Sequence, residues 1–297
     1  HLEYHDGMER YFEAKRKLFS DYTAPGWLGA VNADDEYGNS LMREFEGNAI
    51  GYSLKAGGEK PRVKLYGGIV REIGIKGMSL SVARPDGKSY EVDSPLIGEY
   101  NASNILESFV IADSLGFEIA SILSGIRNCK RVPGRLERYS LSNGVTVFVD
   151  YAHSADGMEQ ALGTLASLSR GPIRVLWGAG GDRTPIKRPV VGNIMARLAS
   201  HVVITTDNPR GEDPADIARD VERGVKNSGR CVRCDTVLDR KEAINHVLDA
   251  SLPGDVVLIA GKGPERFIEY KTRKVPFVDS EAVLEWARGH SAEEILG

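Results

Sequence analysis

The stretch Ile173-Arg-Val-Leu-Trp-Gly-Ala-Gly-Gly-Asp-Arg183 decides the fold, because a short apolar strand passes directly into a glycine-rich loop that ends in an acid and a base. The same order of strand, loop and helix recurs through the second half of the chain. Strands are predicted at Val145–Val149, Ile173–Trp177, Val202–Thr206 and Asp255–Ile259, and helices near Gly157–Leu168, Pro189–Ala199, Ala215–Lys226 and Arg240–Ala250. Short apolar strands that alternate with amphipathic helices predict an α/β fold with a mostly parallel sheet, which right-handed crossovers would make doubly wound.

The ends of these strands predict a binding site. In open parallel sheets, ligands bind outside the carboxyl ends of the strands. Glycines allow a ligand to approach the backbone closely, and N–H groups together with Lys and Arg side chains favour anions. Each segment alone could be an ordinary loop, but four of them on one edge predict a site. The four segments are Asp150–His153, Gly178–Arg183, Thr206–Arg210 and Gly261–Glu265.

The first half of the chain has a mixed pattern. It predicts a helix at Met8–Phe19, a strand at Trp27–Val31, a helix near Asn39–Phe45, a strand at Ala49–Leu54, antiparallel strands over Val63–Val92, and helices at Ser103–Leu115 and Ile119–Asn128. A length of 297 residues suggests about two domains. The segment Lys130–Arg135 is the predicted junction, so we expect one domain over residues 1–132 and a second over residues 133–297.

The composition is that of an average globular protein, with 41% hydrophobic and 27% charged residues. The 38 basic and 42 acidic side chains give a net charge of −4, so no nucleic acid is expected as a partner. No run of 18 apolar residues is present, so no membrane partner is expected either. The sparse, odd number of three cysteines predicts a cytoplasmic location, and the isolated CxxC of Cys231 and Cys234 predicts neither a zinc site nor a redox pair.

Two common nucleotide-binding motifs are absent from the sequence. The Gly178–Arg183 loop lacks the third glycine of G-x-G-x-x-G, which disfavours a nicotinamide-dependent oxidoreductase. A P-loop of the form G-x-x-x-x-G-K-[ST] is also missing. The chain begins at His1 rather than at Met, inside patterned sequence, and we therefore expect that it is an N-terminally truncated piece.

Lys15 is a second feature of interest, in the predicted helix Met8–Phe19. The apolar residues of this helix share one face, and Lys15 is predicted at an inward position among them. Two interpretations remain open: a lysine whose stem runs along the edge of an apolar stripe, or a partly buried amine that can be modified or meet a ligand. The apolar residues are Met8, Tyr11, Phe12, Leu18 and Phe19.

A series of ordered motifs covers essentially the whole chain, and by these motifs it resembles the Mur ligases, most closely the members that add a diamino acid. The resemblance implies the C-terminal part of a central ATPase domain, without its P-loop, followed by a Rossmann-like, doubly wound C-terminal domain. The motifs are His1-Leu-Glu-Tyr-His5, Tyr11-Phe-Glu-Ala-Lys-Arg-Lys-Leu-Phe19, Gly98-Glu-Tyr-Asn-Ala-Ser-Asn104, Val132-Pro-Gly-Arg-Leu-Glu137, Asp150-Tyr-Ala-His-Ser-Ala-Asp156, Gly178–Arg183, Lys187-Arg-Pro189, Asp207-Asn-Pro-Arg210 and Gly261-Lys-Gly-Pro-Glu265.

The resemblance implies an ATP-dependent amide ligase of peptidoglycan precursor synthesis, with ATP and Mg²⁺ as cofactors. ATP would phosphorylate the D-Glu carboxylate of UDP-MurNAc-L-Ala-D-Glu, and the amine of a diamino acid would then attack the acyl phosphate. The protein would have to neutralise the charge on the transferring phosphoryl group and align both partners. The expected partners are these two substrates, and a monomer is expected.

The resemblance also implies roles for individual residues. Lys15 matches the lysine that the family carbamylates, so it would be a catalytic residue and a bridging Mg²⁺ ligand, and His1 matches a second ligand of that metal. Asn101 and Asn104 match residues near the adenine, Arg135 and Asp150 match residues at the ribose and phosphates, and His153 is a further catalytic candidate on the Asp150 loop. The implied substrate-binding residues are Arg183, Asp207, Asn208, Arg210, Gly261 and Glu265.

Arg210 bears on which amino acid is added. At the fourth position of its motif it is implied to bind the distal carboxylate of meso-2,6-diaminopimelate as a bidentate fork, which favours this amino acid over L-lysine. One departure from the family pattern concerns the same pocket, because Pro264 replaces a histidine, removes a backbone N–H and stiffens the loop. An L-lysine-adding relative, a ligase similar to folylpolyglutamate synthase and a non-catalytic binding module remain as alternatives.

Overall fold

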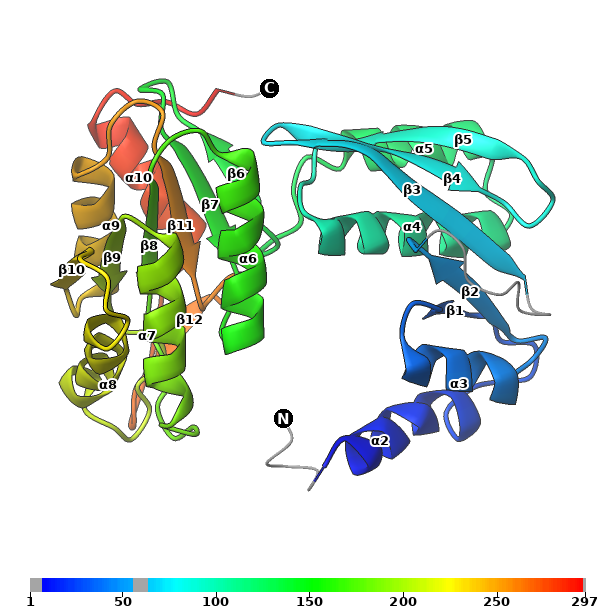
Figure 1. Cartoon of the computed structure of the whole chain (residues 1–297), viewed down its shortest axis with the longest axis horizontal. Helices are drawn as coiled ribbons and strands as arrows, with labels where there is room; N and C mark the ends of the chain where they lie inside the picture. The colour runs from blue at the N-terminus through cyan, green and yellow to red at the C-terminus, as the bar shows by residue number, and fades with distance from the viewer. Residues whose placement is uncertain (1–6, 56–63, 296–297) are drawn as a thin grey trace. The chain divides into compact units, whose positions relative to one another are not determined.

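The chain folds into two compact units, residues 1–130 and residues 131–297. Their structure is a computed structural model that describes residues 7–55 and 64–295. Figure 1 shows both units. The division falls at the start of the predicted junction, Lys130–Arg135.

The first unit is built on a five-stranded sheet in the order β1-β2-β3-β4-β5. The strands β1 (Gly29–Asn32), β2 (Ala49–Ser53) and the start of β3 (Leu65–Gly74) run parallel. β3, β4 (Gly77–Ala83) and β5 (Ser89–Ser94) then form an antiparallel meander, as the sequence predicts for this region. Gly87 turns the chain between β4 and β5 with φ 86° and donates its N–H to Arg84 O at 3.0 Å.

Helices cover this sheet and close its core. α4 (Glu99–Ser114) buries Leu106 and Phe109 completely, and the rings of Tyr66 and Tyr90 pack against Phe109. The first turn of α4 precedes the predicted start at Ser103, because the buried side chain of Asn101 takes the place of an apolar residue there. The other helices among the described residues of this unit are α2 (Met8–Ser20), α3 (Glu36–Glu44) and α5 (Ile119–Asn128).

The second unit is built on a six-stranded sheet in the order β10-β9-β8-β11-β7-β6. All neighbouring strands run parallel except β6 (Glu137–Ser140) and β7 (Thr146–Asp150). β8 (Ile173–Trp177), β9 (His201–Ile204) and β11 (Val256–Ala260) lie in the centre with β7, and these four are the predicted strands. They are apolar throughout because a parallel strand covered on both faces has no side facing water.

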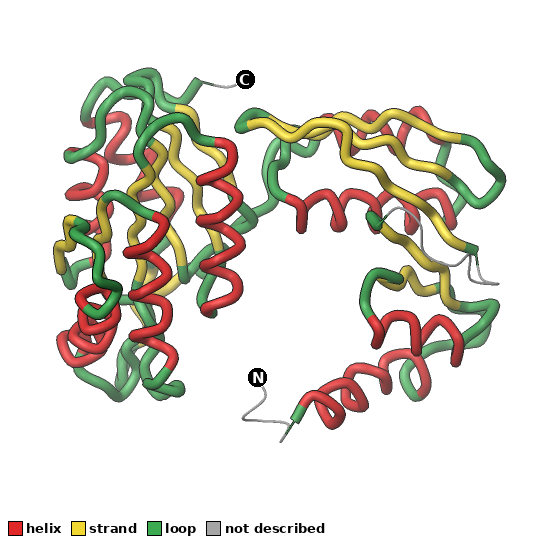
Figure 2. The backbone as a smooth tube through the Cα atoms, in the orientation of Figure 1, coloured by secondary structure: helices red, strands yellow, loops and turns green. Residues whose placement is uncertain are grey.

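Helices cover both faces of this sheet, as Figures 1 and 2 show, which confirms the predicted doubly wound α/β layering. α9 (Arg240–Asp249) and α10 (Asp279–Gly289) pack on one face through a cluster that includes Val247, Val283 and Trp286. The other face carries α6 (Ala155–Leu168), α7 (Lys187–Leu198) and α8 (Pro214–Lys226). Two small pieces complete the unit, the edge strand β10 (Arg233–Thr236) and the hairpin of β12 (Phe267–Glu269) and β13 (Lys274–Pro276).

Within residues 7–55 and 64–295, none of the helices has the length and apolar character that crossing a membrane requires.

Candidate functional site

The loops that follow the four central strands of the second unit are bonded to one another. The Gly181 N–H donates to Asn208 O at 2.9 Å, which joins the loops after β8 and β9. Gly261 N donates to Asp150 O at 3.2 Å, which joins the loops after β11 and β7. Lys262 Nζ, after β11, donates to Asn208 Oδ1, after β9, at 3.2 Å and joins the two pairs, so the four loops are connected to one another.

Glycines are required in these loops because the loops touch each other. A Cβ at Gly178 would overlap the backbone of Thr205–Asp207, and a Cβ at Gly181 would overlap Pro209. Gly261 has φ 107°, a backbone conformation that residues with a side chain rarely adopt. These three glycines thus allow the loops at this edge to pack closely.

A buried lysine, Lys262, stands at the centre of the edge. Its side chain is fully buried, and its Nζ donates to Glu265 Oε2 at 2.8 Å and to Asn208 Oδ1 at 3.2 Å. Asn208 Nδ2 donates to the same Glu265 oxygen at 2.7 Å. The sequence motif that contains Lys262 predicts no role for this residue, although a lysine between two glycines at a strand end is an available signal.

These bonds determine the charge of Glu265. Burial acts to raise the pKa of this carboxyl, but the hydrogen bonds from Lys262 and Asn208 and the charges of Lys262 and Arg210 outweigh it, so the pKa is lowered. The Tyr151 hydroxyl also bonds to Glu265, and burial followed by this carboxylate raises the pKa of Tyr151. Glu265 is therefore a carboxylate at neutral pH, bordered by groups from the loops after β7, β9 and β11.

Arg210 presents a cation beside this carboxylate. Its backbone has φ 49°, and its guanidinium donates from NH1 to Gly181 O at 2.8 Å and from Nε to Glu269 Oε2 at 3.1 Å. The side chain is 28% exposed. Among the described residues these two bonds occupy two of the five N–H hydrogens of the guanidinium, and the others remain for a ligand. Arg183 lies close by, because a Cβ on Gly180 would be 3.2 Å from Arg210 NH1 and 3.7 Å from Arg183 Cγ.

The chemistry of this pair suits a zwitterion. A guanidinium binds a carboxylate in a planar, bidentate manner, and a carboxylate accepts hydrogen bonds from an ammonium group. Arg210 and Glu265 therefore offer complementary charges to an amino-acid end, which carries one carboxylate and one ammonium. Arg183, Asn208, Arg210, Gly261 and Glu265 are the predicted residues that meet here.

The two aspartates of the predicted site are both buried. Burial raises the pKa of Asp207, against the opposing charges of Arg240 and Lys262. Asp150 accepts the N–H groups of Leu136 and Ala152 at 2.7 and 2.8 Å, one on each carboxylate oxygen. Asp150 thus ties Leu136, which directly follows the predicted junction, to the end of β7, and any nucleotide contact would have to share these oxygens.

Arg135 and His153 both lie near the Tyr151 ring, and both are exposed. The Arg135 guanidinium lies 5.9 Å from the ring centroid, and the His153 ring lies 4.7 Å from it. His153 Nδ1 is 2.8 Å from Tyr151 O, so this carbonyl accepts a hydrogen bond when Nδ1 carries the proton. Within the described residues, the hydrogen bond to Tyr151 O involves Nδ1 and not Nε2 of His153.

The predicted residues of the first unit lie on two helices. Asn101, in the first turn of α4, is buried and donates Nδ2 to Ile97 O at 2.8 Å. Asn104, one turn later and exposed, donates Nδ2 to Asn101 Oδ1 at 3.3 Å, so the two amides form a linked pair. His1 lies outside the described residues.

The inward position predicted for Lys15 is wrong. Lys15 is exposed on α2, with its Nζ 5.6 Å from the Tyr11 ring centroid. Only Phe12 and Phe19 of the expected stripe pack against the cluster of Val31, Leu41, Met42 and Ala49, while Leu18 is 61% exposed. The stripe is narrower than the spacing predicts because α2 packs along a single line of contact, and Lys15 lies beside that line.

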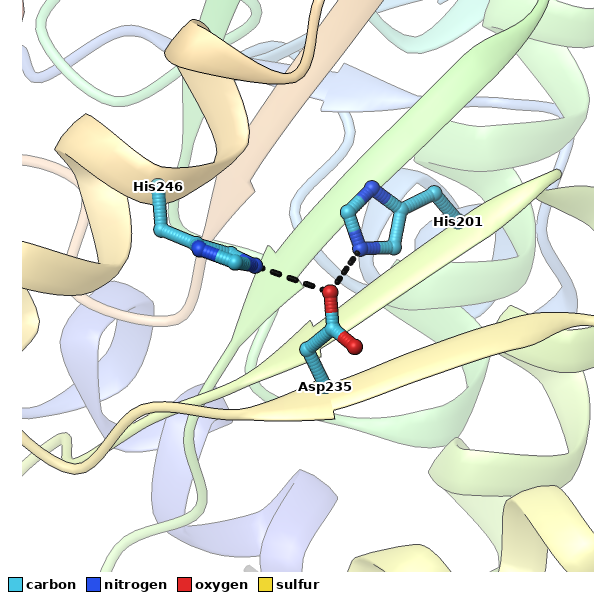
Figure 3. A group of neighbouring side chains, drawn as sticks. All are labelled: His201, Asp235 and His246. Atoms are coloured by element: carbon cyan, nitrogen blue, oxygen red, sulfur yellow. Dashed lines mark hydrogen bonds and ion pairs between the residues drawn. The ribbon is translucent and has the colours of Figure 1, made fainter.

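A second cluster of titratable groups lies at the opposite, amino-terminal end of the second sheet (Figure 3). Asp235 Oδ2, on β10, is 2.8 Å from Nε2 of His201 and 2.8 Å from Nε2 of His246. His201 is buried at the start of β9, and His246 is half-buried on α9. These three side chains have the donor types of a transition-metal site.

The neighbours of this cluster favour protons over a metal. Arg174 NH1 is 3.2 Å from His201 Nδ1, and because a guanidinium can only donate, this nitrogen is the acceptor and Nε2 carries the proton. Arg233 NH2 also pairs with Asp235 Oδ2 at 2.8 Å. Metal binding at His201 Nε2 would place an Nδ1–H against Arg174, so we interpret the cluster as an aspartate that binds two imidazole N–H groups.

Comparisons with known proteins are consistent across sequence and structure. The family model described as the Mur ligase middle domain matches residues 1–112, and the Mur ligase, glutamate ligase domain matches residues 134–263. A UDP-N-acetylmuramoyl-L-alanyl-D-glutamate--2,6-diaminopimelate ligase of Synechococcus elongatus is 37% identical over 286 residues, which is 95% of this chain and 55% of that protein. The ligase of the same name from Zymomonas mobilis is 39% identical over 268 residues, which is 90% of this chain and 53% of that protein.

Solved structures show the same relationship. A structure of a UDP-N-acetylmuramoyl-L-alanyl-D-glutamate--2,6-diaminopimelate ligase matches with a TM-score of 0.61 and 29% identity, covering 96% of this chain and 57% of that one. The folylpolyglutamate synthase of Thermotoga maritima matches with a TM-score of 0.58 and 15% identity, covering 76% of this chain and 48% of that one, which shows a shared fold alone. The chain spans about half the length of the curated relatives it matches.

Proposed function

The chain belongs to the Mur ligase family, and from this premise we propose that it is the middle and C-terminal part of an ATP-dependent ligase that adds meso-2,6-diaminopimelate to UDP-MurNAc-L-Ala-D-Glu. The relatives at 36–39% identity that carry this activity in their names support the proposal. The product would be an amide of a peptidoglycan precursor, and the expected location of the reaction is the cytoplasm.

The observation that carries the proposal is that the Arg210 guanidinium lies near enough to the Glu265 carboxylate at the strand edge for its charge to lower the pKa of that carboxyl. The distal end of meso-diaminopimelate has a carboxylate for Arg210 and an ammonium group for Glu265. L-Lysine has no distal carboxylate, so it would leave the guanidinium without its ligand. The Arg210 N–H groups that Glu269 and Gly181 do not bind would then have no acceptor from the substrate, and because unpaired, partly buried donors are costly, the site should discriminate against L-lysine. Asn208 binds Glu265, Arg183 lies near Arg210, and Gly261 lies beside Asp207, so we assign these residues to the same amino-acid site.

The proposed reaction has two steps, phosphoryl transfer and amide formation. The γ-phosphoryl group of ATP is transferred to a D-Glu carboxylate oxygen, and ADP leaves. The amine nitrogen of the diamino acid then attacks the acyl carbon, loses a proton, and expels phosphate together with that oxygen. In this scheme Arg210 and Glu265 orient the amino acid for attack, which converts an encounter of two molecules into a step within one complex.

The cofactors of the scheme are ATP and Mg²⁺. We assign Asn101 and Asn104 to the adenine, Arg135 and Asp150 to the ribose and phosphates, and His153 to the reacting end of the same loop. Lys15 and His1 would hold Mg²⁺, Lys15 as a carbamate, because an unmodified ammonium group repels a cation. The exposure of Lys15 fits this assignment, since CO₂ and metal can both reach its amine. When bound, Mg²⁺ would neutralise charge on the phosphates.

The test is a phosphate-release assay on the complete protein that contains this chain, with ATP, Mg²⁺ and the UDP-MurNAc-dipeptide. Release that depends on meso-diaminopimelate and is much slower with L-lysine is the expected result. Faster release with L-lysine would make the protein the lysine-adding relative. No release with either amino acid, in a preparation that still binds them, would favour a non-catalytic binding module.

A further inference from the structure

Arg210 is held by a second element besides its own loop, the hairpin of β12 and β13. Arg210 N donates to Glu269 O at 3.0 Å, and Arg210 Nε donates to Glu269 Oε2 at 3.1 Å. A parallel bridge joins Arg210 to Tyr270, the next residue of the hairpin. Glu269 thus fixes both the backbone of Arg210, which is in the left-handed region, and its guanidinium.

Glu269 also contacts the other groups of the pocket. Its backbone N–H donates to Asn208 Oδ1 at 2.8 Å, the oxygen that Lys262 also binds. Its second carboxylate oxygen, Oε1, lies 3.4 Å from Lys274 Nζ across the hairpin. One residue therefore connects Arg210 to Asn208, while Lys274 holds its carboxylate from the opposite side.

These contacts decide which edge of the Arg210 guanidinium a ligand meets. The Nε–H is taken by Glu269 and one NH1 hydrogen by Gly181 O, so a carboxylate can bind only to the remaining hydrogens of NH1 and NH2. A flexible guanidinium would instead adopt several orientations. A carboxylate that binds it in a bidentate manner would then lose affinity, because binding would have to fix one orientation.

We propose that Glu269 is a positioning residue that turns the outer edge of Arg210 toward the distal carboxylate of the amino-acid substrate and so sets the preference for a dicarboxylic diamino acid. Glu269 does not touch the substrate in this assignment. The inference rests on the proposed function, because it concerns the amino-acid pocket of that reaction.

The test compares Glu269→Ala and Glu269→Gln with the unaltered enzyme in the phosphate-release assay. In Glu269→Ala we expect the KM for meso-diaminopimelate to rise about tenfold, the loss of one hydrogen bond between charged groups. We expect kcat and the KM for ATP to change less than about twofold, and the ratio of kcat/KM for meso-diaminopimelate to that for L-lysine to fall. Glu269→Gln keeps an acceptor without the charge, so its KM should lie between the two.

Two control variants separate positioning from a general effect on the fold. Lys274→Ala removes the other ionic partner of Glu269 and leaves the bond to Arg210 in place, and Glu285→Gln alters an exposed ion pair with Lys241 on a distant helix. Both should keep the KM for meso-diaminopimelate within about twofold of the original. An equal rise of KM in Lys274→Ala, or an unchanged KM and unchanged preference in Glu269→Ala, would overturn the assignment. An unaltered enzyme without activity toward meso-diaminopimelate would instead refute the proposed function itself.

Discussion

The guanidinium of Arg210 carries the proposed choice of substrate, so its removal should act on one substrate only. Arg210→Ala should lower kcat/KM for meso-diaminopimelate by about a hundredfold, because two charge-assisted hydrogen bonds are lost. Arg210→Lys should recover little of this, since an ammonium group is not a planar fork. The KM for ATP should be retained in both variants. Diaminopimelate kinetics that are the same as in the original enzyme would refute the role of Arg210.

A Lys15→Ala variant tests the proposed role of a Lys15 carbamate in holding Mg²⁺. Lys15→Ala should abolish phosphate release, and formate or acetate at high concentration should restore part of it, because a small carboxylate can replace the lost carbamate. Lys17→Ala is a matched control, since Lys17 is another exposed lysine on α2, and it should retain full activity. A fully active Lys15→Ala variant would show that no carbamate at this position is needed.

For single residues, the sequence shows which positions belong to the site better than it shows how buried their side chains are or what they contact. The motif around Asp207–Arg210 and the motif that ends at Glu265 could both be found, because small and charged residues at strand ends are unusual. The burial of Lys262 could not be predicted, since it depends on two loops that are more than 50 residues apart. The same limit applies to Glu269, whose partner Arg210 lies 59 positions earlier, and to Lys15, whose surroundings depend on how α2 packs.

Among the secondary-structure elements, β9 and β10 are joined by a hydrogen bond between two titratable side chains, His201 and Asp235. His201 on β9 donates to Asp235 on β10 and accepts from Arg174 on β8, and His246 on α9 and Arg233 on β10 also face Asp235. Burial lowers the pKa of His201 from its ordinary value of 6.5. Burial acts to raise the pKa of Asp235, but hydrogen bonds from His246, His201 and Arg233 lower it to about 2.

These shifts predict two windows of acid destabilisation. Below pH 6.5 the unfolded chain takes up a proton on His201 more readily than the folded one, so stability falls as the pH decreases through this range. A second loss follows as the pH falls from 3.8, the ordinary value of Asp235, toward about 2. Urea unfolding between pH 8 and pH 4 should show the first loss, and His201→Gln should remove it. His153→Gln, which alters an exposed histidine, should keep it. An unchanged slope in His201→Gln would contradict the assignment.

The elements that could be predicted are those whose pattern reflects burial on both faces. β7, β8, β9 and β11 are apolar runs, and the predicted bounds agree within about two residues. Short edge strands give a weaker pattern: the short alternating run that begins at the CxxC and ends at Val237 indicates a strand, which β10 confirms, but it is too brief to fix the bounds of Arg233–Thr236. The hairpin β12–β13 has three residues in each strand and was not predicted, although it carries Glu269.

At the scale of the whole molecule, two separate cores predict two unfolding transitions. The second core contains Arg240 and Asp279, a pair with no exposed side-chain surface, joined at 2.7 and 2.8 Å. Arg240 also donates to Thr206 O and Ala260 O, so it joins α9 and α10 to the ends of β9 and β11. Removal of one partner of a buried, bonded ion pair costs about 3–5 kcal/mol.

Arg240→Ala should therefore lower one calorimetric transition by about 10 °C and leave the other where it was, since about 1 kcal/mol shifts a unit of this size by 2–4 °C. Arg219→Ala is the control within the same unit, because its ion pair with Asp216 is exposed and should contribute less than about 0.5 kcal/mol. A single transition that shifts as a whole in Arg240→Ala would mean that the two units unfold together. Two transitions of which only one moves would assign that transition to residues 131–297, because the lost pair holds only the core of this unit together.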